Sequence, residues 1–167
     1  MSAAEGAPRA EAAVSDGVIT ITISSDLAAP PASVWAVIAT FAGVNAELMP
    51  YCRMVEPRSL RGRTLGSYRP GERATCWLLA GGIVPFDRHR LGLASVDPGR
   101  GFVEESTTWL QRRWRHERVV APDGEGTTVT DRLTVVPRLR VAAPFTARTV
   151  RRVFVHRHRR LRSRFGA

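Results

Sequence analysis

Hydrophobic and polar residues alternate along the segment from Val18 to Ser24. Ile19, Ile21 and Ile23 occupy every second position, and threonines stand between them. A period of two in a run rich in β-branched residues is typical of a strand with one buried and one solvated face. We therefore expect the ordered part of the chain to begin with a β-strand.

The period changes after a pair of prolines at positions 30 and 31. Apolar residues then recur at spacings of three and four over residues 34–41, and proline is favoured at the start of a helix. A second short helical stretch follows at 44–49, between Gly43 and Pro50. The pattern predicts two short helices after the first strand.

Short β-prone runs separated by turn residues fill the chain from Tyr51 to Val136, where no stretch favours a helix of ordinary length. The separators contain glycine, proline and aspartate, as expected for the turns of an antiparallel meander. The predicted strands are residues 51–59, 73–80, 86–96, 101–109, 112–121 and 127–136.

After Pro137 an apolar stripe at helical spacing runs through a strongly basic segment, and it predicts a long final helix. Its residues are Val150, Phe154, Leu161 and Phe165. The order of elements predicts an α+β fold, in which an antiparallel sheet of about seven strands buries one face on the C-terminal helix.

Residues 1–16 contain almost nothing to bury, so we predict a disordered tail there and one domain over residues 17–167. Charged residues interrupt any apolar core of a signal peptide in this tail. No stretch of the chain offers the roughly 18 uncharged apolar residues of a membrane span. We therefore expect a cytoplasmic protein.

The formal net charge is +10, and all 25 basic residues are arginine. Such an excess attracts nucleic acid and anionic lipid without sequence preference. Cys52 and Cys76 show no metal-ligand spacing, and we expect both to be buried free thiols.

Several segments resemble the START-like helix-grip superfamily (SRPBCC), which includes polyketide cyclases and lipid-transfer domains. The opening "ITISSDLAAPPASVWAVIATFAGVNAELMP" looks like its first strand and two short helices. The segments "GGIVPFDRHRLGL", "GFVEESTTWLQRRWRHERVV", "TTVTDRL" and "VFVHRHRRLRSRFG" are similar to a bacterial ligand-binding subgroup. The resemblance implies a curved sheet wrapped around the final helix and a cavity between them, open near the short helices. It implies no fixed catalytic set.

The hairpin of residues 112–121 and 127–136 can be registered by closing it symmetrically about its connection. The pairs are then His116 with Asp131, Trp114 with Leu133, and Arg118 with Val129. Because side chains alternate between faces, one side holds Trp114, His116, Val129, Asp131, Leu133 and Val135. The apolar character of this set predicts that it faces inward.

On the final helix, Arg157 shares the apolar stripe with Phe154 and Leu161, so its side chain should also point inward. An inward arginine is costly unless it is paired with an acidic group. We expect Asp131 to be its partner, with Glu105 as the second choice.

A polar cluster of His116, Asp131 and Arg157 at the wall of an apolar cavity has two interpretations. It is a satisfied internal salt bridge, or it orients a ligand and supplies His116 and Asp131 as acid–base groups. The tryptophans are mostly core material, although one or two could stack on a planar ligand. The predicted ligand-binding residues are Trp77, Glu105, Trp114, His116, Asp131, Leu133, Phe154 and Arg157.

The sequence gives little support for a metal site, a catalytic nucleophile or a nucleotide cofactor. His89, His156 and His158 lie among charged residues, and we expect them to be exposed. No metal-binding, nucleophile-elbow, phosphate-loop or dinucleotide motif is present, so we predict no metal and no cofactor.

Three functions remain, in decreasing order of support. The first is binding or transport of a small hydrophobic ligand. The second is a cyclase- or dehydratase-like enzyme that acts on an aromatic or polyketide substrate. The third is non-specific binding of nucleic acid or anionic surfaces through the arginines of the final helix, although a charge run on a covering helix is usually a solvated face.

Overall fold

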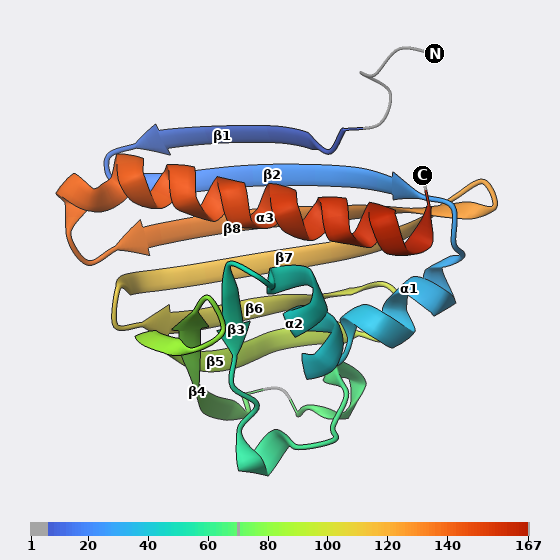
Figure 1. The fold of residues 1–167 in the computed structure, drawn as a ribbon, viewed down its shortest axis with the longest axis horizontal. Helices are drawn as coiled ribbons and strands as arrows, with labels where there is room; N and C mark the ends of the chain where they lie inside the picture. Colours follow the sequence, from blue (N-terminus) through green and yellow to red (C-terminus); the bar gives the residue numbers. More distant parts are fainter. Residues whose placement is uncertain (1–6, 70, 167) are drawn as a thin grey trace.

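An eight-stranded antiparallel sheet curves around one long C-terminal helix in the computed structural model of the chain (Figure 1). The structure describes residues 7–69 and 71–166. The sheet order is β1-β2-β8-β7-β6-β5-β4-β3. The strands are β1 (Arg9–Ser15), β2 (Val18–Leu27), β3 (Cys52–Met54), β4 (Arg73–Ala80), β5 (Val84–Asp97), β6 (Gly101–Thr108), β7 (Gln111–Asp123) and β8 (Gly126–Pro137). The helices are α1 (Pro31–Ile38), α2 (Phe41–Leu48) and α3 (Ala143–Phe165).

This architecture confirms the predicted α+β helix-grip class, with one strand more than expected. Helix α3 crosses the concave face, and the two short helices lie beside its C-terminal half (Figure 1). Single 3₁₀ turns complete the chain at Arg58–Leu60, Leu65–Ser67 and Arg140–Ala142.

The additional strand, β1, corrects the prediction of a disordered tail over residues 1–16. It pairs along its whole length with β2, so that Ala12 lies opposite Ile21. Asp16 and Gly17 both have positive φ, the conformation of the tight turn that Asp-Gly favours between two strands. The small side chains of β1 bury little apolar area, and its backbone pairing holds it in place. Residues 1–6 lie outside the described part.

A second correction concerns the predicted strand at 51–59, of which only β3 (Cys52–Met54) forms. Pro57 follows shortly after and lacks the N–H that a longer strand would need. The chain then makes the first two 3₁₀ turns before β4.

The register between β7 and β8 differs from the predicted one by two residues. The connection is a two-residue turn, because Asp123 already pairs with Gly126. His116 therefore lies opposite Leu133, and Arg118 lies opposite Asp131. A shift of two leaves every side chain on its predicted face, since the strand period is two.

The core lies where α3 and the short helices meet the sheet. The isoleucines of β2, together with Leu133 and Val135 on β8, pack against Phe154 of α3. A second cluster joins the helices α1 and α3 to β7 and β8, with Val34, Ile38, Val120, Val129 and Leu161. Two register shifts interrupt the ladders on the β4–β6 side of the sheet, at Leu78/Leu79 and Leu93/Ser95, and such irregularities locally bend and twist a strand.

Candidate functional site

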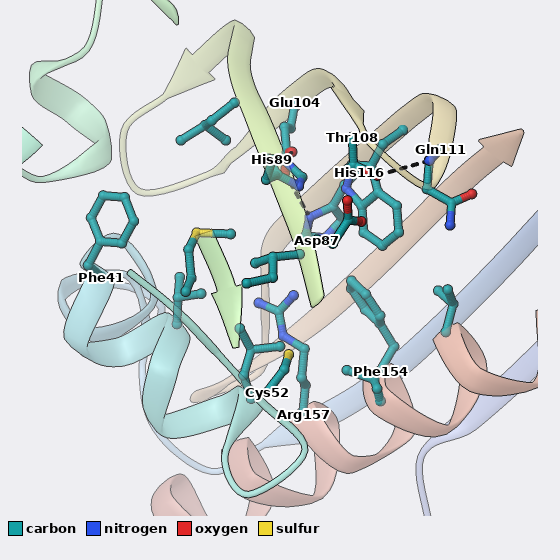
Figure 2. Close-up of a pocket in the computed structure, with 18 of the residues that line it drawn as sticks. Phe41, Cys52, Asp87, His89, Glu104, Thr108, Gln111, His116, Phe154 and Arg157 are labelled. Carbon is teal, nitrogen blue, oxygen red and sulfur yellow. Dashed lines mark hydrogen bonds and ion pairs between the residues drawn. The ribbon is translucent and has the colours of Figure 1, made fainter. Parts of the chain in front are cut away.

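A cavity of about 390 Å³ lies between the concave face of the sheet and α3 (Figure 2). Strands β3 to β7, helix α2 and the N-terminal half of α3 provide its walls. Most of the lining side chains are apolar, among them Val44, Leu48, Leu91, Leu93, Phe102, Val150 and Phe154.

The most exposed lining side chains mark where the cavity opens. Phe145 at the start of α3 is 72% exposed, Leu110 in the β6–β7 turn 50%, and Phe86 at the start of β5 43%. The lining side chains of α2, such as Val44 and Leu48, are half-buried or buried. These side chains place an opening at the β4–β5 and β6–β7 turns, whereas the resemblance implied an opening near the short helices.

Polar side chains interrupt the apolar lining where β5 and β6 run side by side (Figure 2). His89 Nε2 and Ser106 Oγ each donate a 2.6 Å hydrogen bond to Glu104 Oε1. Burial raises the pKa of Glu104, but the neighbouring His89 and His116 outweigh it, so the pKa lies well below its ordinary value. Glu104 is therefore a buried anion in the cavity wall.

His116 on β7 links this wall to a second group of charges. Its Nε2 donates to Asp131 Oδ1 at 2.9 Å, and its Nδ1 lies 3.8 Å from Glu104 Oε2. The ring packs edge-on against Phe102 and Phe154, with 5.1 Å between ring centres in each pair. His116 thus forms the boundary between the cavity and the charges behind it.

Asp131 on β8 is completely buried and accepts four hydrogen bonds. Arg118 donates two of them at 2.7 Å, His116 donates one, and His158 Nε2 donates the fourth at 3.1 Å. Burial raises the pKa of Asp131, but Arg118 and His116 hold it well below its ordinary value. Every acceptor position of this carboxylate is filled, so Asp131 has no free lone pair for a ligand.

Arg118 also reaches Glu47 on α2, and this contact ties the short helix to the sheet. Its Nη1 lies 3.0 Å from both oxygens of Glu47, and Arg157 Nε on α3 donates to Glu47 Oε2 at 2.9 Å. Burial alone would lower the pKa of Arg118. The carboxylates of Asp131 and Glu47 have the larger, opposite effect, so the pKa lies above its ordinary value. We refer to Glu47, Arg118, Asp131, Arg157 and His158 as the ion cluster.

Asp87 is the remaining buried carboxylate of the cavity wall (Figure 2). Its Oδ1 accepts hydrogen bonds from the backbone N–H groups of Arg88, Trp109 and Leu110, which fixes the β6–β7 turn against β5. Its Oδ2 makes no hydrogen bond to any residue in the described part of the chain, and no cationic side chain there pairs with it. Asp87 therefore offers the cavity an acceptor without a protein partner.

Four of the eight predicted ligand-binding residues line the cavity: Trp114, His116, Phe154 and Arg157. Asp131 and Leu133 lie on the predicted inner face but are buried behind the cavity wall. Trp77 was misplaced, since it lies on the outer face, 38% exposed and edge-on to Trp109 at 5.0 Å between ring centres.

The two predicted partners of Arg157 were both wrong. Glu47 pairs with Arg157, Asp131 pairs with Arg118, and Glu105 lies on the outer face, where Arg115 binds it at 2.5 Å. No local pattern identifies Glu47, because its pairing depends on how α2 packs against distant strands.

Two of the histidines that we expected to be exposed are buried. His89 is 3% exposed and His158 is fully buried, whereas His156 is half-buried and bonds the carbonyl oxygen of Met49. The period of each element could have identified the first two. His89 alternates with charged residues on β5, and His158 lies four positions from Phe154 on α3.

Cys76 is buried as predicted, and burial raises its pKa to about 12. Cys52 is half-buried in the cavity wall, and burial also raises its pKa. Over residues 7–69 and 71–166, no three or more His, Cys, Asp or Glu side chains are grouped so as to hold a metal ion. None of the helices in these ranges has the length and apolar character needed to cross a membrane.

Comparison with known proteins identifies the fold. A family model described as "Domain of unknown function (DUF8410)" matches residues 25–165, and no curated protein matches. Protein CV1439 from Chromobacterium violaceum superposes with a TM-score of 0.68 at 15% identity, over 89% of this chain and 97% of that one. A START superfamily protein from Mycobacterium smegmatis gives a TM-score of 0.64 at 12% identity, over 87% and 96% of the two chains.

A third similar structure is DynU16, a protein in the dynemicin biosynthetic locus. It superposes with a TM-score of 0.57 at 14% identity, over 86% of this chain and 47% of DynU16. These likenesses confirm the START-like helix-grip fold predicted from the sequence. At such low identity they show the fold alone.

Proposed function

We propose that this chain, which belongs to the DUF8410 family, binds a small and mainly apolar molecule that also carries a hydrogen-bonding group. The observation that carries the proposal is the cavity of about 390 Å³ between the sheet and α3. Pockets for small molecules typically measure ~300–1,000 Å³ and combine an apolar lining with a few polar groups. The coarse function of a ligand-binding fold agrees with the START-like structures that this chain resembles.

The polar groups of the cavity suggest how a ligand is oriented. Asp87 Oδ2 is an acceptor with no partner among residues 7–69 and 71–166, so it favours a ligand hydroxyl or amine at that position. Arg157 lies on the opposite wall, with its guanidinium 4.6 Å from the ring centre of Phe154. A ligand donor near Asp87 would pair that oxygen, and a ligand acceptor near Arg157 would add to the ion pair that Arg157 already forms with Glu47.

Binding can be tested without knowledge of the natural ligand. The neutral probe N-phenyl-1-naphthylamine should bind with a fluorescence increase, and a Val150→Trp variant that fills the cavity should lose most of that increase. Arg151→Trp places the same side chain on the exposed side of the same helix and should bind like wild type. Equal binding by both variants would place the probe outside the cavity and contradict the proposal.

The natural ligand can be identified by native purification from the host, denaturation and mass spectrometry of the released molecule. Asp87→Asn is the informative variant, because the amide keeps an oxygen for the three backbone N–H groups and turns an NH₂ toward the cavity. A ligand held through its own donor should be reduced at least tenfold in occupancy. Unchanged occupancy would mean that Asp87 does not hold the ligand.

The second candidate function is a proton-transfer enzyme of the cyclase or dehydratase kind, and two histidines in the cavity wall favour it. His89 and His116 both line the cavity, and each lies beside the buried Glu104, at 2.6 Å and 3.8 Å. An imidazole positioned by a carboxylate at the wall of a pocket is a common general acid or base.

Binding and catalysis can be distinguished by adding the released molecule back to ligand-free protein. The mass of the molecule is then followed with time. His116→Asn should stop conversion and leave binding intact if the chain is an enzyme. An unchanged mass with wild-type protein would contradict catalysis and leave the binding function alone.

A further inference from the structure

Exposed large hydrophobic side chains are concentrated at one end of the molecule. Twelve occur among the described residues, and eight of them lie in three short segments at this end. The most exposed are Val141 at 90%, Ile83 at 80%, Phe145 at 72% and Leu139 at 70%. Single exposed hydrophobic residues are ordinary, whereas a contiguous group of them marks an interaction site.

Three segments form this group, and we refer to them as the rim: residues 83–86 in the β4–β5 turn, 109–110 in the β6–β7 turn, and 139–145 between β8 and α3. All three lie at the same end of the sheet (Figure 1). Hydrogen bonds join them, because Asp87 Oδ1 accepts from the N–H groups of Trp109 and Leu110, and Arg138 N donates to Leu110 O at 3.0 Å.

The rim surrounds the opening of the cavity. Phe86, Leu110 and Phe145, one residue from each segment, are exposed to solvent and also line the cavity. A hydrophobic surface docked on the rim would therefore be continuous with the cavity lining. An apolar ligand could then pass between the two without crossing water.

Positive charge borders the rim. Arg112, Arg138, Arg148 and Arg152 are exposed, and none of them forms a salt bridge within the described part of the chain. Asp87, next to the rim, is buried, and the exposed Asp16 lies nearby on the β1–β2 turn, where Arg140 bonds its carbonyl oxygen. An apolar surface bordered by unpaired arginines matches the interface of an anionic bilayer, where the two act together.

From this arrangement we infer that the rim docks on an anionic membrane surface. The side chains of the three turns enter the acyl boundary, and the bordering arginines contact the lipid headgroups. The cavity then opens toward the bilayer. The inference goes beyond the proposed function, and its test requires no ligand, so failure of one does not imply failure of the other.

The first test is flotation with vesicles of phosphatidylcholine alone, or with about one third phosphatidylglycerol. Wild type should float with the anionic vesicles and be released by high salt. A Leu139→Asp and Val141→Asp double variant should lose at least about tenfold in partitioning, because both side chains are highly exposed and lie in the rim. An Ala32→Asp and Ala36→Asp double variant makes the same change in charge at exposed positions of α1, at the other end of the molecule (Figure 1), and should float like wild type.

A second measurement distinguishes insertion from adsorption by charge. Lipids brominated in their acyl chains should quench the tryptophan fluorescence of wild type, since Trp109 lies in the rim and is 56% exposed. The double variant of the rim should show little quenching. Three results would each overturn the inference: no flotation at low salt, which would point to an acidic protein as the partner; equal loss in the α1 control variant; or flotation without quenching.

Discussion

The space between the sheet and α3 ends in two different ways. Beside the C-terminal half of α3 the ion cluster joins α2, β7, β8 and α3, and every charge in it has a partner. Beside the N-terminal half the rim leaves side chains such as Val141 and Ile83 almost fully in water. One end has buried charge that is compensated, and the other has apolar surface that is not covered.

The contrast indicates where stability and function reside. Charges that have been removed from water hold their elements firmly, because the loss of any one partner leaves another charge unpaired. Exposed apolar side chains add nothing comparable to the folded state, and they promote association with other surfaces. The closed end therefore fixes the fold, and the open end admits the ligand and meets the partner.

Breaking the closed end should have the largest effect on stability. Arg118→Ala leaves Asp131 and Glu47 buried without their shared cation. We expect the free energy of unfolding to fall by ~3–5 kcal/mol, as is typical for one partner removed from a buried ion pair. Urea unfolding followed by circular dichroism measures the change.

Arg132→Ala is the matched control, because this arginine lies on the outer face of β8 and contacts Glu117 at 3.2 Å with its side chain 56% exposed. Solvent screens such a pair, so the change should stay within about 0.5 kcal/mol. Similar losses in the two variants would mean that burial of the cluster does not set its contribution.

Acid should weaken the closed end and the adjoining wall next most strongly. Folding lowers the pKa of Asp131 and of Glu104 below their ordinary values of 3.8 and 4.5. The unfolded chain therefore takes up these protons first as the pH falls. The stability is present above about pH 5 and is lost as the pH drops through this range toward the lower pKa values of the folded state.

Glu104→Gln should make this pH dependence less steep, by up to ~1.4 kcal/mol per pH unit for the one proton removed. The measurement is urea unfolding between pH 7 and pH 3. Glu72→Gln is the comparison, because Arg63 lowers the pKa of this surface carboxyl to about 2 and solvent screens the pair. An equal flattening by both variants would contradict the special role of the buried carboxylate.

The sequence allowed the fold to be predicted because local pattern and topology agree. Alternation identified β2, helical spacing identified α3, and turn residues separated the strands between them. The inward faces of Trp114, His116 and Asp131 were also predicted correctly despite a register error, since a shift of two residues preserves the face.

The candidate site could be predicted only in part, because polar residues on an inner face break the pattern that identifies such a face. Strand β6 reads Gly-Phe-Val-Glu-Glu-Ser-Thr-Thr, in which no apolar alternation tells Glu104 from Glu105. The partner of Arg157 depends on Glu47, whose position follows from the packing of α2 against strands far away in the sequence.

Aromatic residues misled the analysis in the opposite direction. Trp77 and Trp109 read as core or pocket material, yet they pack on each other at the surface, where Trp109 is part of the rim. Cys76 is buried, so strand alternation places Trp77 on the other face of β4. Periodicity would have been a better guide there than residue type.

Widening the open end should change ligand kinetics more than stability. Phe145→Ala truncates an exposed side chain that lines the opening, so a neutral fluorescent probe should dissociate roughly three- to tenfold faster. Leu139→Ala alters a side chain of similar exposure that does not line the cavity, and its rate should match wild type. Stopped-flow displacement measures both rates, and equal rates in the two variants would place the opening elsewhere.

The smallest expected effect is the stability of the rim variant with aspartate at positions 139 and 141. Leu139 and Val141 are 70% and 90% exposed, so the folded state gains little from burying them, and their removal should change the free energy of unfolding by less than about 0.5 kcal/mol. The two new carboxylates lie near Arg138, Arg140 and Arg148, which are all exposed, so no buried charge is created. Urea unfolding of this variant beside wild type measures the difference. A loss comparable to that of Arg118→Ala would show that the rim is part of the stable core. That result would contradict the assignment of stability to the ion cluster and of function to the rim.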